Sequence, residues 1–229
     1  MHNLIKTQYK IVMSQPILIE DYTPRNIVLG KVDEKCVKFY YPAEKDGEFE
    51  KIRFQIPSMR IPFDIDQKDT QSGKIFVKNI SLSTNDIGSD NNKKRIDILR
   101  TKILKTEKYI KKHLPEHLKD KTFYSSLWQG KNKDYKPTFK VSMGFDRDNR
   151  CKAGIFDNDN NPVEHTTIAK GQVVSMVIFL DKVWIYRDKI GLNWDVEQIK
   201  IHSNPGESVS DKNETSQPKL NKFSIRKDT

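Results

Sequence analysis

Residues 172–180 read Gln-Val-Val-Ser-Met-Val-Ile-Phe-Leu, and this stretch decides the fold. Apolar side chains fall on both alternating faces of the run, as they do in a strand that is buried on both sides in the middle of a sheet. The run is far shorter than the roughly 20 apolar residues that a bilayer-spanning helix needs. The sequence therefore predicts a central β-strand here rather than a membrane segment.

Further apolar or alternating runs lie on both sides of this central strand in the sequence. Turn residues separate many of them, including Lys45-Asp46-Gly47 and Asp146 to Asn149. Consecutive strands joined by such short turns favour antiparallel hairpins. With the central strand, the expected strands are Cys36–Tyr41, Phe49–Ile56, Lys74–Leu82, Thr138–Phe145, Arg150–Phe156, Gln172–Tyr186 and Trp194–Ile201.

One segment has a helical period instead. Between Lys93 and Leu114 the apolar residues recur at multiples of three and four, which predicts an amphipathic helix that Pro115 ends or kinks. From Lys93 to Lys121 there are 11 Lys and Arg residues against four acidic ones, so this segment carries most of the chain's net charge of +10. A single basic helix between two groups of strands predicts a mainly β (α+β) fold. An OB-like antiparallel barrel fits best, although other α+β folds remain open.

The 229 residues are enough for one large domain, and their composition is polar and basic. Lys and Arg number 41 against 31 Asp and Glu, an excess that favours polyanionic partners such as nucleic acid. The sequence turns polar near its end, so we expect a globular domain over residues 1–202 and a disordered tail over residues 203–229. Only Cys36 and Cys151 are present, and residues 1–10 lack the hydrophobic core of a signal peptide, so we expect an intracellular, reducing compartment.

Basic and aromatic residues alternate on several of the expected strands. Lys38 and Tyr40 share one face of their strand, and Lys182, Trp184 and Tyr186 share a face of theirs. Cations follow the phosphates of a single-stranded nucleic acid, and exposed rings stack on its unpaired bases. We therefore expect phosphate contacts at Lys38, Lys51, Arg53, Lys74, Lys78, Lys136 and Lys140, base stacking at Tyr40, Phe76, Trp184 and Tyr186, and a clamp at Arg147, Arg150 and Lys152.

Simpler interpretations of the same residues stay open. The rings could pack beneath the helix or a loop, while the lysines only solvate a sheet edge. The basic helix could follow phosphates at the rim of a groove, or it could be an ordinary solvated surface. The sequence does not decide whether the helix or a sheet face would be the main binding surface.

No combination of residues makes a convincing catalytic, cofactor or metal site. Residues 113–117 have the spacing of an inverted zinc-peptidase motif, but Pro115 would distort the helix that this motif requires. Residues 157–161 begin like a calcium loop, yet Pro162 and Ile168 replace the glycine and glutamate of an EF-hand. The sequence therefore predicts a non-catalytic protein with no cofactor and no metal, and a metal-dependent hydrolase built on residues 113–117 is the weakest alternative.

The second half of the chain resembles a known family. The resemblance rests on Tyr135–Val141, Lys170–Ile178, Val183–Ile185 and Ile190–Lys200, within which Gly191-Leu192-Asn193-Trp194-Asp195-Val196-Glu197-Gln198 is the most recognisable part. These residues are similar to the single-stranded-DNA-binding proteins of nucleocytoplasmic large DNA viruses, of the African swine fever virus and giant-virus type. They are more distantly similar to the single-stranded-DNA-binding proteins of tailed phages.

This resemblance implies an OB fold and a sequence-tolerant, non-catalytic protein that coats single-stranded DNA in viral DNA replication, repair or recombination. It implies a location in the host cytoplasm, at a viral factory, or in the virion. One departure concerns the tail, because phage proteins of this type end in an acidic tail that recruits partners, whereas residues 203–229 are slightly basic. We expect no membrane partner. RNA binding, contacts with viral replication proteins and the oligomeric state remain open, and the alternative function is a basic structural or scaffold protein of a virion or viral factory.

Overall fold

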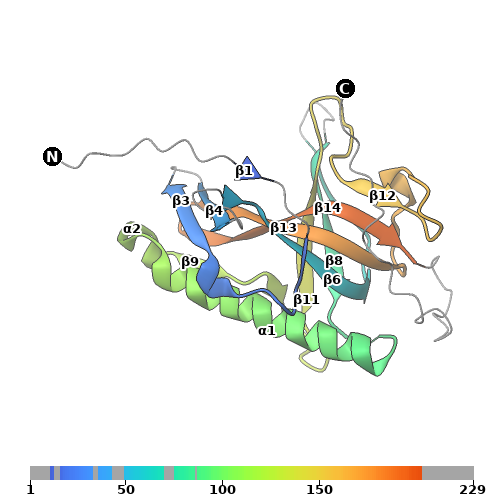
Figure 1. The fold of residues 1–229 in the computed structure, drawn as a ribbon, viewed down its shortest axis with the longest axis horizontal. Coiled ribbons are helices and arrows are strands. Elements are labelled where there is room, and N and C mark those ends of the chain that lie inside the picture. Colours follow the sequence, from blue (N-terminus) through green and yellow to red (C-terminus); the bar gives the residue numbers. More distant parts are fainter. Residues whose placement is uncertain are drawn as a thin grey trace.

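The computed structural model describes residues 11–12, 16–32, 36–42, 49–69, 75–85 and 87–202. The expected tail, residues 203–229, lies outside these described residues, as does Lys74. Within the described part, the element order is a series of short strands, one long helix, and then a second series of strands that ends in two long ones. Figure 1 shows the helix running along one side of the sheet.

Two long strands form the middle of the sheet. Strand β13 (Val173–Tyr186) and strand β14 (Lys189–Ile201) make an antiparallel hairpin along almost their whole length. The other edge of β13 pairs antiparallel with β6 (Ile52–Arg60) near its start and with β4 (Cys36–Pro42) near its end. The apolar run at residues 172–180 is therefore a central, buried strand, as the sequence predicts.

The other edge of β14 is covered in pieces. Three shorter strands pair with it in parallel, one after another: β9 (Thr122–Tyr124), β11 (Thr138–Gly144) and β12 (Gly154–Phe156). Strand β11 then pairs antiparallel with β8 (Ile75–Ser83), and β8 pairs with β7 (Asp66–Asp69). The remaining elements are β1 (Ile11–Val12), β2 (Ile17–Leu18), β3 (Val28–Val32), β5 (Phe49–Glu50), β10 (Leu127–Trp128), η1 (Pro24–Asn26) and η2 (His165–Thr167).

The predicted mainly β (α+β) fold with one basic amphipathic helix is confirmed, and the sheet differs in two details from the expected OB-like antiparallel barrel. The sheet is mixed rather than wholly antiparallel, and its path of hydrogen-bonded strands does not close into a ring. On its outer edge β14 pairs in parallel with three strands that are each shorter than β14, and the pairs β1–β5 and β2–β6 are parallel as well. Segments that arrive after loops, rather than hairpin partners, fill that edge.

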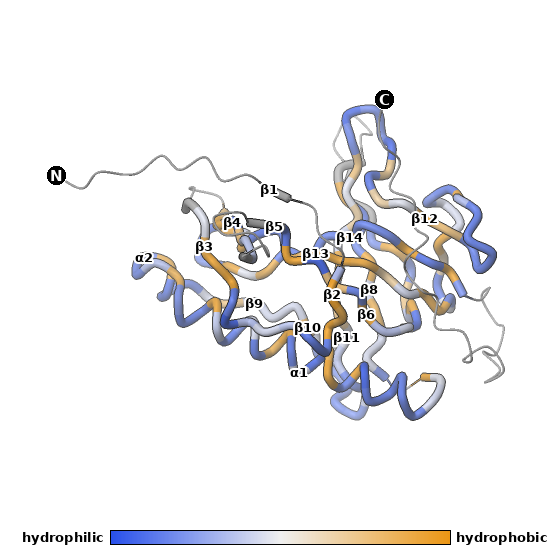
Figure 2. The backbone as a smooth tube through the Cα atoms, in the orientation of Figure 1, coloured by the Kyte–Doolittle hydropathy of each residue, from blue (hydrophilic) through white to orange (hydrophobic). Residues whose placement is uncertain are grey.

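Helix α1 (Asp90–His113) begins three residues before the predicted start because Ser89 caps it. The Ser89 hydroxyl accepts a hydrogen bond from the backbone N–H of Asn92 at 3.3 Å, which satisfies one of the free donors of the first turn. The helix ends before Pro115, as predicted, and the short helix α2 (Glu116–Lys119) follows. Figure 2 shows that hydrophilic residues dominate α1, with hydrophobic residues between them. The buried apolar side chains of α1 are Ile96, Leu99, Ile103 and Ile110.

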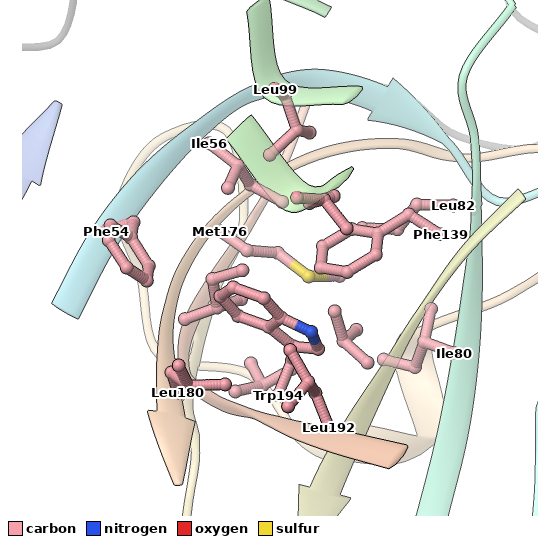
Figure 3. Close-up of a cluster of buried hydrophobic side chains, with 14 of the residues drawn as sticks. Phe54, Ile56, Ile80, Leu82, Leu99, Phe139, Met176, Leu180, Leu192 and Trp194 are labelled. Carbon is pink, nitrogen blue, oxygen red and sulfur yellow. The ribbon is translucent and has the colours of Figure 1, made fainter. Parts of the chain in front are cut away.

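The centre of the core lies between α1 and the inner face of the β13–β14 hairpin, around Trp194 (Figure 3). The Trp194 ring lies 5.7 Å, centroid to centroid, from the rings of Phe54 and Phe139. Its indole N–H donates a hydrogen bond to the Ser126 hydroxyl at 2.8 Å. This core fixes the inner face of the sheet and leaves the opposite face for other contacts.

Some of the basic residues of α1 hold the N-terminal segment in place. Lys102 donates hydrogen bonds to the backbone carbonyls of Glu20, at 2.9 Å, and Tyr22. Arg95 forms an ion pair with the Glu20 carboxylate. Lys102 and Arg95 are therefore engaged in structural contacts. Fewer positive charges of α1 are available to bind an anionic ligand than its sequence suggests.

Candidate nucleic-acid interface

One face of the sheet points away from the core. In β14, Leu192, Trp194 and Val196 are buried, so the odd-numbered residues 191–197 face outward. Residues directly opposite each other in neighbouring strands share a face. We call this side of the sheet the outer face. By register it carries Cys36, Lys38, Ser142, Lys182, Trp184, Tyr186, Asn193 and Asp195.

Three aromatic side chains gather at one end of the outer face. Tyr124 of β9 lies opposite Gly191, which in turn lies opposite Trp184. The ring centroids of Tyr124 and Trp184 are 6.2 Å apart. Tyr124 is 46% exposed, Tyr186 is 59% exposed, and Trp184 is half-buried. We call Tyr124, Trp184 and Tyr186 the ring cluster.

A glycine determines how Trp184 lies in this cluster. A Cβ atom added at Gly191 would lie 2.5 Å from Cζ2 of Trp184, so the indole rests directly on the bare backbone of β14. Tyr40 has the same relation to Gly30 of β3, where an added Cβ would lie 2.6 Å from Cε2 of the ring. Both rings therefore pack closely over the backbone of a glycine in the neighbouring strand.

Cations surround the ring cluster. The Lys189 ammonium lies 5.3 Å from the centroid of the Tyr124 ring, and the Arg187 guanidinium lies 5.2 Å from that of Tyr186. A hydrogen bond with Tyr124 raises the pKa of Lys189 above its usual value, so this side chain stays charged at neutral pH. Lys38 and Lys182 lie directly opposite each other on neighbouring strands. Two like charges in such a pair repel each other, and an anion bound between them would relieve this repulsion.

A bulge extends this surface toward the other end of β13. Asp181 has no partner in β14, because Leu180 pairs with Trp194 and Lys182 with Asn193. The extra residue shifts the alternation by one place, so Phe179 faces outward together with Lys182. The Lys51 ammonium lies 4.4 Å from the centroid of the Phe179 ring, which makes a second contact between a cation and a ring on this face.

Of the predicted phosphate-binding side chains, Arg53 is covered and Lys78 lies on the core side of its strand. Arg53 lies on the expected side of β6, but it is only 6% exposed and forms a two-point ion pair with Glu197, with Nε at 2.6 Å from one carboxylate oxygen. Lys78 was expected on the side away from the core, whereas the burial of Ile80 and Leu82 places it on the core side of β8. Its ammonium lies 5.8 Å from the centroid of Phe145.

The remaining predicted residues are spread more widely. Lys140 faces outward 3.6 Å from Asp66, and Lys136 lies 3.9 Å from Asp97 of α1. Arg147, Arg150 and Lys152 are exposed on and after the hairpin turn that follows β11, where the Asp146 carboxylate accepts backbone hydrogen bonds from Asp148 and Arg150, both at 2.8 Å. The side chain of Phe76 lies outside the described residues, as Lys74 does. The structure therefore brings together Lys38, Lys51, Tyr40, Trp184 and Tyr186 on the outer face.

Sequence reasoning missed several residues of this face. Tyr124 and Trp128 belong to strands of three and two residues, which are too short for an alternating pattern to be recognised. Lys189 begins β14 five residues earlier than the sequence predicts. The exposed Tyr135 lies in the loop after β10. The sequence signal that could have identified this region is the occurrence of a tyrosine or tryptophan close to several lysines.

Within the described part of the chain, no three His, Cys, Asp or Glu side chains come together as metal ligands. In the zinc-like motif, Nδ1 of His113 lies 2.7 Å from the carbonyl oxygen of Tyr109, so that nitrogen makes a contact within the helix. Among the described helices, none combines the length and the apolar character needed to cross a bilayer.

The acidic side chain of Asp195 lies on the otherwise mainly positive outer face. The pKa of the Asp195 carboxyl group is raised to about 6, mainly by burial and to a smaller extent by repulsion from Asp181. Asn193 donates a hydrogen bond to this carboxyl group at 2.7 Å, and Lys182 contacts the neighbouring Asp181 at 3.1 Å. The outer face therefore gains positive charge as the pH falls through about 6.

Replacing Asp195 with asparagine should raise the free energy of unfolding at pH 7 by about 2–3 kcal/mol and leave it unchanged near pH 4. The carboxylate form is disfavoured only in the folded state, so this group lowers stability as the pH rises from about 4 to about 6 and keeps it low above that. Urea unfolding of both proteins across this pH range measures the difference. A difference between variant and wild type that does not change with pH would contradict the assignment.

The wild-type protein must be measured alongside the variant, because a second group, His202, changes the free energy of unfolding with pH in the opposite sense to Asp195. Burial, and then repulsion from Lys200, lower the pKa of His202 to about 4. The folded protein therefore resists protonating this ring, and its contribution to stability rises with pH between about 4 and 6.5. Subtracting the wild-type profile from that of the Asp195→Asn variant removes this effect.

No protein-family model and no curated protein sequence matches the chain. Among solved structures, the fold is similar to a single-stranded-DNA-binding protein encoded by bacteriophage T7, with a TM-score of 0.44 and 13% identity over 73% of this chain and 97% of that one. It is similar to the single-stranded-DNA-binding protein of bacteriophage Enc34, with a TM-score of 0.41 and 12% identity over 80% of this chain and 93% of that one. The Enc34 protein in complex with single-stranded DNA gives a TM-score of 0.38 and 11% identity, over 80% and 98% of the two chains.

Proposed function

We propose that this chain binds single-stranded DNA without sequence specificity and without catalysis, through the outer face of its sheet. The observation that carries this proposal is the ring cluster, in which Tyr124 and Tyr186 are exposed and each has a cation within 5.3 Å of its ring centroid. Rings bind bases by stacking, and the neighbouring cations bind the phosphates that join those bases. The contacts are not specific for one base, because every base has a face that can stack.

A single strand fits this surface better than a duplex does. In a duplex the faces of the bases are stacked on each other, so exposed rings would find nothing to bind. Lys38, Lys51, Lys182 and Lys189 would follow the phosphates, and Trp184 and Tyr186 would stack on bases.

We also propose that this binding serves viral DNA replication, repair or recombination, inside the infected cell at a viral factory or in the virion. The support for this is the resemblance of Lys170–Ile178 and Ile190–Lys200 to single-stranded-DNA-binding proteins of large DNA viruses, together with the net charge of +10. Viral replication proteins would then be the partners. Binding of RNA is compatible with the same surface, because rings and lysines do not recognise the 2′-hydroxyl group.

A titration of tryptophan fluorescence with oligo-dT, with a duplex of equal length and with heparin tests the proposal. We expect oligo-dT to quench the emission and to bind more tightly than the duplex. Affinity should fall by about 0.7 log units per phosphate contact for each tenfold rise in salt, or roughly 600-fold if four lysines take part. Equal weak binding of all three polyanions, without quenching, would contradict the proposal and favour the basic scaffold protein.

A further inference from the structure

A second tryptophan, Trp128, lies on the outer face, on strand β10 four residues after Tyr124. Trp128 is 58% exposed and lies opposite Thr138 of β11 in the register of β10 and β11. In β11 the buried residues are Phe139, Val141 and Met143, so Thr138 faces outward with Lys140. The side chain of Trp128 therefore stands on the same face of the sheet as Trp184.

The loop that follows Trp128 presents a second ring and several cations. Gln129 donates side-chain hydrogen bonds to the carbonyl oxygens of Asn132, at 3.3 Å, and Tyr135, at 2.8 Å, which holds the loop closed. Tyr135 is 64% exposed. Residues 128–136 include three lysines and one aspartate, and Lys131 and Lys133 are exposed. We call residues 128–136 the Trp128 loop.

Polar side chains connect this loop to the ring cluster across the outer face. Lys140 and Ser142 follow Thr138 along β11, two residues apart on the same side. The Ser142 hydroxyl lies 3.3 Å from the side-chain oxygen of Asn193, and Asn193 lies opposite Lys182. No apolar barrier separates the two sets of rings among these described residues, so one flexible, anionic chain could lie along the whole path.

We propose that the Trp128 loop is a second stacking site for the DNA strand that the ring cluster binds. The strand reaches this loop only when it is longer than the ring cluster alone can hold. This inference rests on the function proposed above. The occupant is a polynucleotide rather than a protein, because the loop combines exposed rings with an excess of positive charge, as the ring cluster does. The expected consequence is a dependence of affinity and of quenching on the length of the strand.

The chain's three tryptophans make this testable by fluorescence. Trp194 is buried in the core and serves as a constant background, while Trp128 and Trp184 report on the two sites separately. The variant Trp184→Phe leaves Trp128 as the surface reporter, and Trp128→Phe leaves Trp184. Both are titrated with oligo-dT from about 4 to about 16 nucleotides, the range of site sizes for one OB fold.

We expect Trp184 to be quenched by every oligonucleotide that binds, and Trp128 only by the longer ones. The variant Trp128→Ala should bind the longest oligonucleotide roughly five-fold to 100-fold more weakly and the shortest with unchanged affinity, and Trp128→Phe should restore most of the loss. Leu104→Ala, which removes an exposed apolar side chain of α1, is the matched control and should change neither.

The possible failures are distinguishable. Quenching of Trp184 at all lengths, with Trp128 never quenched and Trp128→Ala without effect, overturns the second site and leaves the proposed function intact. Quenching of neither tryptophan, with no binding, overturns both. A loss of affinity in Trp128→Ala that is the same for every length overturns the proposal as well, because it makes Trp128 part of one compact site. A urea unfolding curve for each variant confirms that it is folded before it is titrated.

Discussion

The double variant Trp184→Ala, Tyr186→Ala is expected to bind oligo-dT roughly 30-fold to several-hundred-fold more weakly than the wild type. Each base stacked on a ring contributes about 1–3 kcal/mol when measured by alanine substitution. The two rings are neighbours on β13, so their effects are not strictly additive, and we expect a combined loss of about 2–4 kcal/mol. Fluorescence anisotropy of a labelled oligo-dT measures this without relying on the tryptophan that has been removed.

The interpretation of this loss requires that the sheet stays intact. Tyr186 is largely exposed and Trp184 rests on Gly191 at the surface, so their removal leaves the buried residues of β13 unchanged. The more conservative variant Trp184→Phe, Tyr186→Phe keeps both rings and should retain most of the affinity. If the alanine variant binds oligo-dT within threefold of the wild type while remaining folded, the ring cluster is not the binding site.

The salt dependence of the same variants separates stacking from charge. Removing rings should leave the slope of affinity against salt unchanged, because no phosphate contact is lost. Removing Lys38 or Lys182 should instead lower that slope by about 0.7 for each contact. These two lysines lie opposite each other on the outer face, where Lys182 also contacts Asp181 at 3.1 Å.

The elements with a long periodic pattern were predictable from the sequence. The apolar run of β13 gave a central strand, and the spacing of Ile96, Leu99, Ile103 and Ile110 gave the buried side of α1. In both elements, the burial of a regularly spaced set of apolar side chains determines the structure. The spacing of those residues in the sequence therefore predicts the element correctly. The cap at Ser89 shifted the start of the helix by a few residues.

The sequence pattern does not reveal where the backbone departs from strict alternation, where an ion pair covers a charged side chain, or which distant strands pair. Alternation back from Lys182 would place Leu180 on the outer face, but the bulge at Asp181 turns Leu180 into the core. Arg53 follows the alternation and is nevertheless covered, because Glu197 on a strand far away in sequence pairs with it. Tyr124 joins Trp184 only through the parallel pairing of β9 with β14, a long-range contact that no local pattern encodes.

The substitution with the largest expected effect on stability is Trp194→Ala, which should lower the free energy of unfolding by about 3–5 kcal/mol. The ring fills the space between Phe54 and Phe139, and removing it leaves a cavity that these neighbours can only partly close. The Ser126 hydroxyl also loses its indole donor. Because small domains are stable by only about 5–15 kcal/mol in total, the variant should unfold at a much lower urea concentration.

Circular dichroism during urea unfolding measures this loss without using tryptophan emission. Trp194→Phe keeps a ring but not the indole N–H, so it should cost less, about 1–3 kcal/mol. Leu104→Ala on the exposed side of α1 should stay within about 0.5 kcal/mol of wild type. A Trp194→Ala protein as stable as the Leu104→Ala control would show that Trp194 is not the centre of the core. The loss should also reach the binding face, because the Trp194 indole N–H that is removed donates to the hydroxyl of Ser126, and Ser126 lies between Tyr124 and Trp128 in the sequence.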